Sequence, residues 1–140
     1  MFRLIARGIL TDGSAHILQF KRTGTGNVRK HLYDAPPSEL AAGNATTFTD
    51  VDVSSSVPIG DTNVYLQANM TPATADNQLK LRVKGGAATA GSVQVYGSVA
   101  SHVSSDNVQI AVNSSSIFQY LVSNSSDAAT ILVQGFDDPL

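Results

Sequence analysis

The stretch Leu79-Lys80-Leu81-Arg82-Val83-Lys84 alternates strictly between apolar and cationic residues. Successive side chains of a β-strand point to opposite faces of a sheet, so this alternation predicts a strand with one buried and one solvent-facing side. The same pattern recurs on both sides of the stretch, at 64–70, 93–96 and 108–113. Two later stretches, 117–122 and 130–136, are apolar on both faces, which is typical of strands that a second sheet or another subunit covers.

Polar turns separate these predicted strands at near-regular spacing, at 85–91, 114–116 and 123–128. Many short strands divided by such turns indicate an all-β fold. We therefore expect an antiparallel β-sandwich of the jelly-roll or immunoglobulin-like type. Its first strand is predicted at 47–53, and a turn at 57–61 leads into the strand at 64–70.

The N-terminal part of the chain predicts a β-hairpin arm. Strands are expected at 2–10 and 15–22 around Asp12-Gly13, because both residues of that pair tolerate positive φ. A second turn at 23–27 leads into a strand at 28–33. Pro36-Pro37 interrupts regular pairing, and 38–42 is expected to form one helical turn. We thus divide the chain into an N-terminal hairpin arm with a Pro/Ala/Gly linker, residues 1–45, and a β-sandwich domain, residues 46–140.

The composition narrows the class of protein. A chain of 140 residues is long enough for one domain that buries about two thirds of its unfolded surface. It contains no cysteine, which excludes a disulfide scaffold, a cysteine nucleophile and a zinc knuckle. Only 14% of the residues are charged, and the formal net charge of -2 gives no general attraction to nucleic acid or to a membrane. We expect neither as a partner.

No catalytic constellation emerges from the ionisable residues. Among three histidines, His102 beside Ser101, Ser104 and Asp106 is the best candidate, but no serine lies in a Gly-x-Ser-x-Gly elbow. Glu39 is the only glutamate, so a hydrolytic pair of carboxylates is not evident. We expect no catalytic residue and a protein that is not an enzyme.

Cofactor and metal sites are not expected either. Asp50 and Asp52 share one face of a predicted strand and would ligate calcium only together with Asp61, without the spacing of a calcium loop. Gly24-Thr25-Gly26 lacks the following Lys-Ser/Thr of a phosphate-binding loop and is expected to be a turn. Asp137-Asp138 is expected to act as a solubilising tail.

The basic residues mark a candidate partner-binding surface. Six of the nine lie in the first thirty residues, interleaved with large apolar residues, and none follows Lys84. An acidic protein surface fits this mixture better than a phosphate backbone does. Lys80, Arg82 and Lys84 either contact an acidic partner or nucleic acid, or form an outward polar face whose charges discourage pairing at a sheet edge. The predicted partner-binding residues are Phe2, Arg3, Arg7, Lys21, Arg22, Arg29, Lys30, Lys80, Arg82 and Lys84.

Five short stretches carry a resemblance to the β-sandwich modules of bacteriophage virions. They are Val57-Pro58-Ile59-Gly60, Val64-Tyr65-Leu66-Gln67-Ala68, Val93-Gln94-Val95-Tyr96-Gly97, Ile117-Phe118-Gln119-Tyr120 and Ile131-Leu132-Val133-Gln134-Gly135-Phe136. Such modules occur in capsid decoration (cement) proteins and in fibre or tail-surface domains. The resemblance covers residues 57–136, so the N-terminal arm lies outside it.

The resemblance implies a non-enzymatic structural protein on the outer capsid surface. It further implies a homotrimer that binds the major capsid protein and stabilises the shell. The N-terminal stretch 1–7 has no apolar core long enough for a signal peptide, so we expect the protein to be made in the host cytoplasm without one. The alternative is a receptor- or glycan-binding module of a phage tail fibre or adhesin, for which the outward-facing Tyr65 and Tyr96 would stack on sugars. A hydrolase on a sandwich scaffold is a third possibility, and the lack of an acid pair or triad argues against it.

Overall fold

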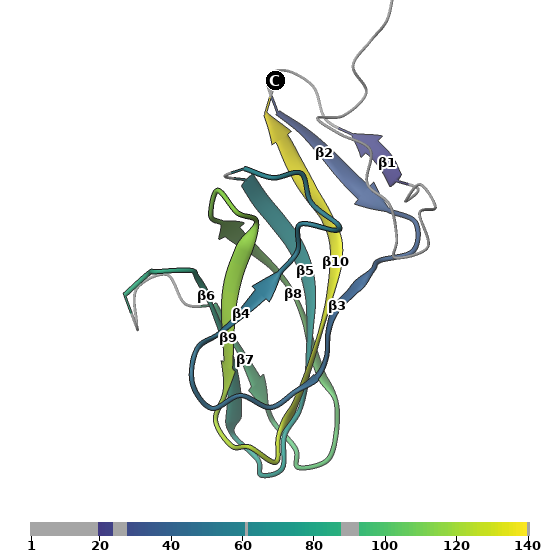
Figure 1. Cartoon of the computed structure of the whole chain (residues 1–140). Coiled ribbons are helices and arrows are strands. Elements are labelled where there is room, and N and C mark those ends of the chain that lie inside the picture. The colour runs from purple at the N-terminus through teal and green to yellow at the C-terminus, as the bar shows by residue number, and fades with distance from the viewer. Residues whose placement is uncertain (1–19, 24–27, 61, 88–92, 140) are drawn as a thin grey trace, which may run out of the picture.

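Two antiparallel β-sheets pack face to face in the structure, a computed structural model that describes residues 20–23, 28–60, 62–87 and 93–139 (Figure 1). These residues form ten strands and no helix. The β-sandwich predicted from the alternating pattern is therefore confirmed. The first predicted hairpin, 2–22, falls almost entirely outside the described residues, and the second is the pair β1 and β2.

One sheet has six strands and the other has four. The six-stranded sheet has the order β1-β2-β10-β5-β8, and β3 also pairs with β10. Its strands are β1 (Phe20–Thr23), β2 (Val28–Tyr33), β3 (Ser38–Gly43), β5 (Thr62–Thr71), β8 (Ser104–Val112) and β10 (Ala128–Pro139). The four-stranded sheet has the order β4-β9-β6-β7. Its strands are β4 (Thr49–Asp52), β6 (Asn77–Val83), β7 (Val93–Gly97) and β9 (Ile117–Val122).

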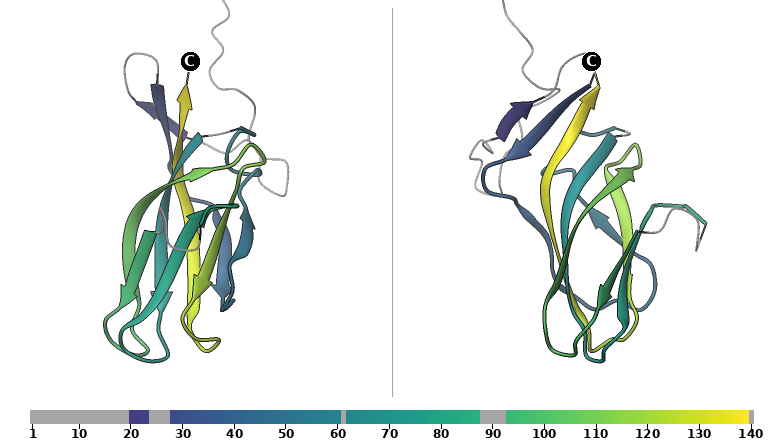
Figure 2. Two further views of the ribbon diagram at one scale, coloured as in Figure 1. Left: turned by 90° about the vertical axis from the view of Figure 1, so that its left-hand side faces the viewer. Right: turned by 180° about the vertical axis from the view of Figure 1, so that it is seen from behind.

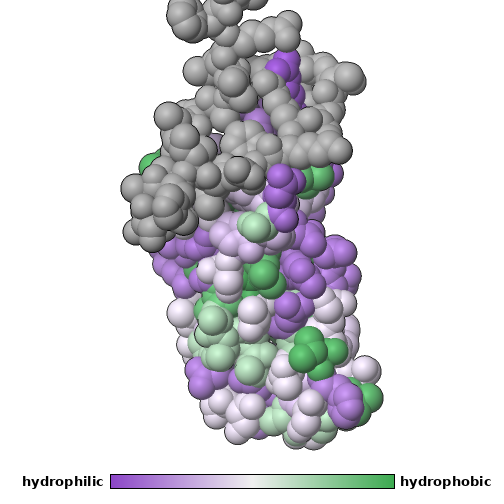
Figure 3. Space-filling view, turned by 90° about the vertical axis from the view of Figure 1, so that its right-hand side faces the viewer, coloured by the Kyte–Doolittle hydropathy of each residue, from purple (hydrophilic) through white to green (hydrophobic). Residues whose placement is uncertain are grey.

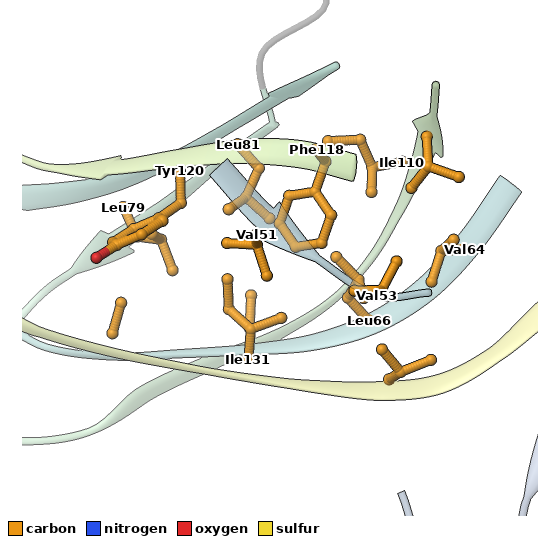
Figure 4. Close-up of a cluster of buried hydrophobic side chains, with 14 of the residues drawn as sticks. Val51, Val53, Val64, Leu66, Leu79, Leu81, Ile110, Phe118, Tyr120 and Ile131 are labelled. Carbon is orange, nitrogen blue, oxygen red and sulfur yellow. The ribbon is translucent and has the colours of Figure 1, made fainter. Parts of the chain in front are cut away.

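The hydrophobic core fills the space between the two sheets. Figure 4 shows Leu79, Leu81 and Phe118 of the four-stranded sheet facing Leu66 and Ile131 of the six-stranded sheet. All five side chains are fully buried. Burying a side chain of this size contributes about 1.5–3 kcal/mol relative to leaving it in water. The strict alternation along β5 and β6 thus has a direct energetic cause, since every second residue enters this layer.

Strand β3 corrects the helical turn expected at 38–42. β2 and β3 pair one after the other with the same side of β10, and Pro36-Pro37 lies between them. The amide of Val133 donates to the carbonyl of Pro37 at 2.9 Å, so the pairing continues past the prolines. Glu39 accepts hydrogen bonds from the hydroxyls of Ser55 and Ser56. Extended backbone therefore gains partners here that a single helical turn would lack.

The strands before residue 45 are part of the larger sheet. Both further views show β2 lying beside the C-terminal part of β10 and antiparallel to it (Figure 2). In this region His31 and Tyr33 of β2 are buried, and the His31 ring stacks on Phe136 of β10 with centroids 4.9 Å apart. The division of the chain at residue 45 stays a prediction, but residues 28–43 complete the sheet that contains β10.

Candidate functional site

The cationic side chains of β6 lie on the outer side of the four-stranded sheet. Lys80 and Arg82 alternate with the buried Leu79 and Leu81, and Lys84 follows at the end of the strand. We call the surface formed by Lys80, Arg82, Lys84 and their neighbours Asp50 and Gln119 the cationic face. β6 lies between β9 and β7, so these charges do not protect a sheet edge, and that reading of the sequence is wrong.

Arg82 is held in a defined orientation. Its Nε donates a hydrogen bond to Oε1 of Gln119 at 2.8 Å, and its guanidinium carbon lies 3.7 Å from the ring centroid of Phe48. A cation over an aromatic face is attracted to the ring, and a planar guanidinium suits this stacking better than an ammonium does. The hydrogen bond to Gln119 uses only Nε. Among the described residues the two terminal nitrogens of the guanidinium form no hydrogen bond, and they remain available to a binding partner.

Asp50 links Gln119 to Lys84. Its Oδ1 accepts a hydrogen bond from Nε2 of Gln119 at 2.8 Å, and its Oδ2 pairs with the ammonium of Lys84. These contacts, chiefly the one with Lys84, lower the pKa of the Asp50 carboxyl. Among the described residues Lys80 forms no ion pair, so Lys80 and Arg82 supply the positive charge of the cationic face.

Tyr96 extends the cationic face onto β7. Its side chain is 55% exposed, and its hydroxyl donates a hydrogen bond to Oε1 of Gln94 at 2.8 Å. Gln94 is in turn the ladder partner of Lys80. The outward orientation predicted for Tyr96 is therefore confirmed, and the face combines an aromatic ring, an amide and a cation.

The N-terminal basic residues that the structure describes do not join this face. Phe2, Arg3 and Arg7 lie outside the described residues. Lys21 and Arg22 are on β1, and Arg29 and Lys30 are on β2, so these four belong to the other sheet. The described members of the predicted partner-binding set are thus divided between two sheets. Seen from the side on which β1, β2 and β3 lie, the described surface is mostly hydrophilic or intermediate, with scattered hydrophobic residues (Figure 3).

Lys30 belongs instead to a cluster around Tyr65 on the outer side of the six-stranded sheet. Its ammonium nitrogen lies 3.8 Å from the centroid of the Tyr65 ring. The Tyr65 hydroxyl donates to Oδ1 of Asp137 at 2.9 Å. Burial, together with the hydrogen bond to Asp137 and its negative charge, raises the pKa of Tyr65 to about 12.

The stability of the protein should consequently fall as the pH rises from 10 to 12. Unfolded tyrosine ionises near pH 10, whereas folded Tyr65 keeps its proton until about pH 12. Because the folded pKa is the higher one, this contribution is complete below pH 10 and is lost as the pH rises through the folded value. We expect urea unfolding of Tyr65→Phe to show a shallower fall over this range than the wild type.

A spectroscopic titration tests the cause of that effect. Asp137→Asn removes the charge beside the hydroxyl and should shift one step of the tyrosinate absorbance titration toward lower pH. Equal alkaline losses of stability in wild type and Tyr65→Phe would contradict the assignment.

The C-terminal aspartates also differ from the expected solubilising tail. Asp137 and Asp138 both lie in β10, and Asp138 is buried, with its Oδ2 3.5 Å from Nε2 of the buried His31. Burial lowers the pKa of His31, and the neighbouring Asp138 opposes this shift. The alternation of residues 28–33 in the sequence could have shown that His31 and Tyr33 share one face of a strand. It could not have shown that Asp138, from the other end of the chain, lies beside His31.

The remaining polar candidates have structural contacts. His102 is exposed in the loop before β8, where its Nδ1 lies 3.1 Å from the carbonyl oxygen of Ala100. Asp52 accepts a hydrogen bond from the amide of Ser54 at 2.8 Å, and Asp61 lies outside the described residues. No group of three histidine, aspartate or glutamate side chains within the described ranges is placed to hold a metal ion.

Sequence reasoning missed one further surface, on the outer side of strands β5, β8 and β10. We call it the amide face; it consists of Gln67, Asn69, Ser105, Asn107, Gln109 and Gln134. Gln67 Nε2 donates to Ser105 Oγ at 3.2 Å, and that hydroxyl donates to Asn69 Oδ1 at 2.6 Å. The sequence contains a pattern that could have predicted this surface, because amide side chains occupy alternate positions at 67 and 69 and again at 107 and 109.

No protein-family model matches the chain, and no curated protein matches it. Within the described residues there is no helix with the length and apolar character needed to cross a membrane.

Proposed function

We propose that this chain is a non-enzymatic structural protein of a bacteriophage virion, a decoration (cement) protein on the outer capsid surface. It acts as a homotrimer and binds the major capsid protein. The observation that carries the proposal is the cationic face, where Lys80 and Arg82 project from a central strand of the four-stranded sheet. The virion-module resemblance of residues 57–136 supports the same conclusion.

The cationic face has the properties of a docking surface for acidic protein. Arg82 is pre-oriented by Phe48 and Gln119, so less side-chain entropy is lost when its guanidinium meets a carboxylate. Opposite charges across an interface speed association and select the correct partner. A protein that binds the assembled shell but not its separated subunits stabilises the shell by mass action.

Neutralising the cationic face should weaken attachment to capsids. We expect Lys80→Gln combined with Lys84→Gln to reduce binding to DNA-free capsids of the phage about tenfold or more at low salt, measured by co-sedimentation. The difference should shrink as salt is added, because screening weakens exposed charges.

The matched control is Gln109→Glu combined with Ala111→Glu. It changes the net charge by the same amount on exposed positions of the opposite sheet. Equal losses in both double variants would mean that only net charge matters, and would contradict a role for the cationic face. Failure of the wild type to bind capsids or to raise their disruption temperature would overturn the proposed function itself.

To test whether the N-terminal arm contributes to capsid attachment, the arm must be shortened without removing strands of the six-stranded sheet. Removal of residues 1–33 would delete β2 and with it the buried His31 and Tyr33. Removal of residues 1–19 ends before β1 and retains every described strand. If the arm anchors the protein, this shorter truncation loses capsid attachment while its unfolding transition remains cooperative.

A further inference from the structure

We propose that the amide face is a binding site for neutral carbohydrate. This inference concerns a different sheet from the cationic face and does not depend on the proposed function. It assigns a ligand class to a surface that the capsid-binding residues do not use.

The chemistry of the amide face matches sugar hydroxyls. Each asparagine or glutamine side chain carries two N–H donors and one carbonyl acceptor in a plane, and a sugar hydroxyl both donates and accepts. Besides the chain from Gln67 through Ser105 to Asn69, Gln134 Nε2 donates to Asn107 Oδ1 at 3.0 Å across β5. These bonds orient the amides of Gln67, Asn69, Asn107 and Gln134 before a ligand arrives, which reduces the entropy lost on binding.

The amide face has no charged side chain and therefore does not favour ionic ligands. None of its six side chains ionises. Asp106 of β8 is the ladder partner of the buried Ala68 and therefore lies on the opposite side of the sheet from Asn107. At the margin, Lys30 and Asp137 both contact Tyr65 and offset each other's charge. An anionic ligand would lose water without gaining an ion pair, whereas a neutral polyhydroxylated ligand exchanges hydrogen bonds with water for equivalent ones.

The spacing of the side chains also suits a sugar chain. Neighbouring strands are about 4.8 Å apart, and alternate residues along a strand are about 6.8 Å apart. These distances are close to the dimensions of one pyranose ring, so consecutive sugars can meet consecutive amides. Lys30 covers one side of the Tyr65 ring, and hence the proposal rests on hydrogen bonding by the amides and not on stacking.

A glycan array with neutral hexose and N-acetylhexosamine oligosaccharides tests the proposal, with sialylated and sulfated oligosaccharides printed beside them. We expect the full chain to bind neutral members and to show no preference for anionic ones. For the best neutral oligosaccharide, ¹H–¹⁵N spectra should show shifted side-chain amide signals of Asn107 and Gln109. Asn107→Ala combined with Gln109→Ala should weaken binding about tenfold or more.

The control is Gln78→Ala combined with Gln94→Ala, which removes two amides from the outer side of the four-stranded sheet. Both double variants should unfold at the wild-type urea midpoint, since Asn107, Gln109 and Gln94 are exposed and Gln78 is half-buried. The control should retain full binding. No binding to any neutral oligosaccharide, or undiminished binding by the Asn107 and Gln109 variant, overturns the proposal. A preference for anionic glycans that is lost in the Lys80 and Lys84 variant overturns it as well and places the glycan on the cationic face.

Discussion

Gly135→Ala is expected to lower the free energy of unfolding by about 3 kcal/mol, at the upper end of the range for overpacked interiors. A Cβ at this position would lie 2.0 Å from the carbonyl oxygen of His31 and 3.0 Å from Cδ2 of Leu32. The nearer atom is backbone, so the clash cannot be relieved by rotating a side chain. β2 and β10 would have to separate where they pair.

The position of Gly135 makes such a separation costly. Gly135 is buried and pairs with Leu32 of β2 on one side and Tyr65 of β5 on the other. The register between β10 and β5 shifts between Val133 and Gly135, as at a β-bulge. Moving the backbone here would disturb both neighbouring strands and the adjacent contact between His31 and Phe136.

Urea unfolding of the purified variant measures this effect. Gly86→Ala is the control, because the nearest atom to a Cβ there is one carbonyl oxygen, that of Val83, at 3.1 Å. We expect the control to change the unfolding free energy by less than about 1 kcal/mol, as surface substitutions usually do. If Gly135→Ala were as stable as the control, the close approach of β2 to β10 would be wrong.

Asp127→Ala is expected to cost about 3 kcal/mol. The Asp127 side chain is buried, and its Oδ1 accepts hydrogen bonds from the Ala73 amide at 2.7 Å and from Asn77 Nδ2 at 2.8 Å. Its Oδ2 accepts from the Asn124 amide at 2.9 Å. Hydrogen bonds to a charged acceptor contribute about 1.5–3 kcal/mol each, and water can replace part of this loss near the surface.

Asp127 joins two turns that are far apart in the sequence. Ala73 lies in the connection from β5 to β6, and Asn77 is the first residue of β6 after that connection. Asn124 lies in the connection from β9 to β10. Asp127→Asn keeps one acceptor oxygen but turns an amide group toward a donor, so we expect a loss of about 2 kcal/mol.

Comparison with Asp106→Ala isolates this contribution. Asp106 is exposed on β8, and removal of its carboxylate should change the urea midpoint little. Equal stability of the Asp127 and Asp106 variants would show that the three hydrogen bonds do not hold the turns together.

The alternating stretches 64–70 and 79–84 predicted strands correctly because the period of two is a property of the strand itself. The segment 38–42 was predicted wrongly as a helical turn, because its conformation depends on pairing with a distant strand and not on its own residues. Glu, Leu and Ala favour helix in isolation, and nothing within Ser38–Gly43 reveals that β10 will pair with it. Residues distant in the sequence decided its conformation.

The candidate sites divide in the same way. The alternation alone placed Lys80 and Arg82 on the outer side of a strand. The contacts of Arg82 with Phe48 and Gln119 depend on the arrangement of neighbouring strands in the folded sheet. The inner and outer sides of the alternating strands, such as β5 and β6, were thus determined by the sequence through the geometry of the extended backbone. Which outer residues meet was decided only by the tertiary structure, because strand order is set by long-range pairing and core packing. The amide face exists only because β8, β5 and β10 lie next to one another.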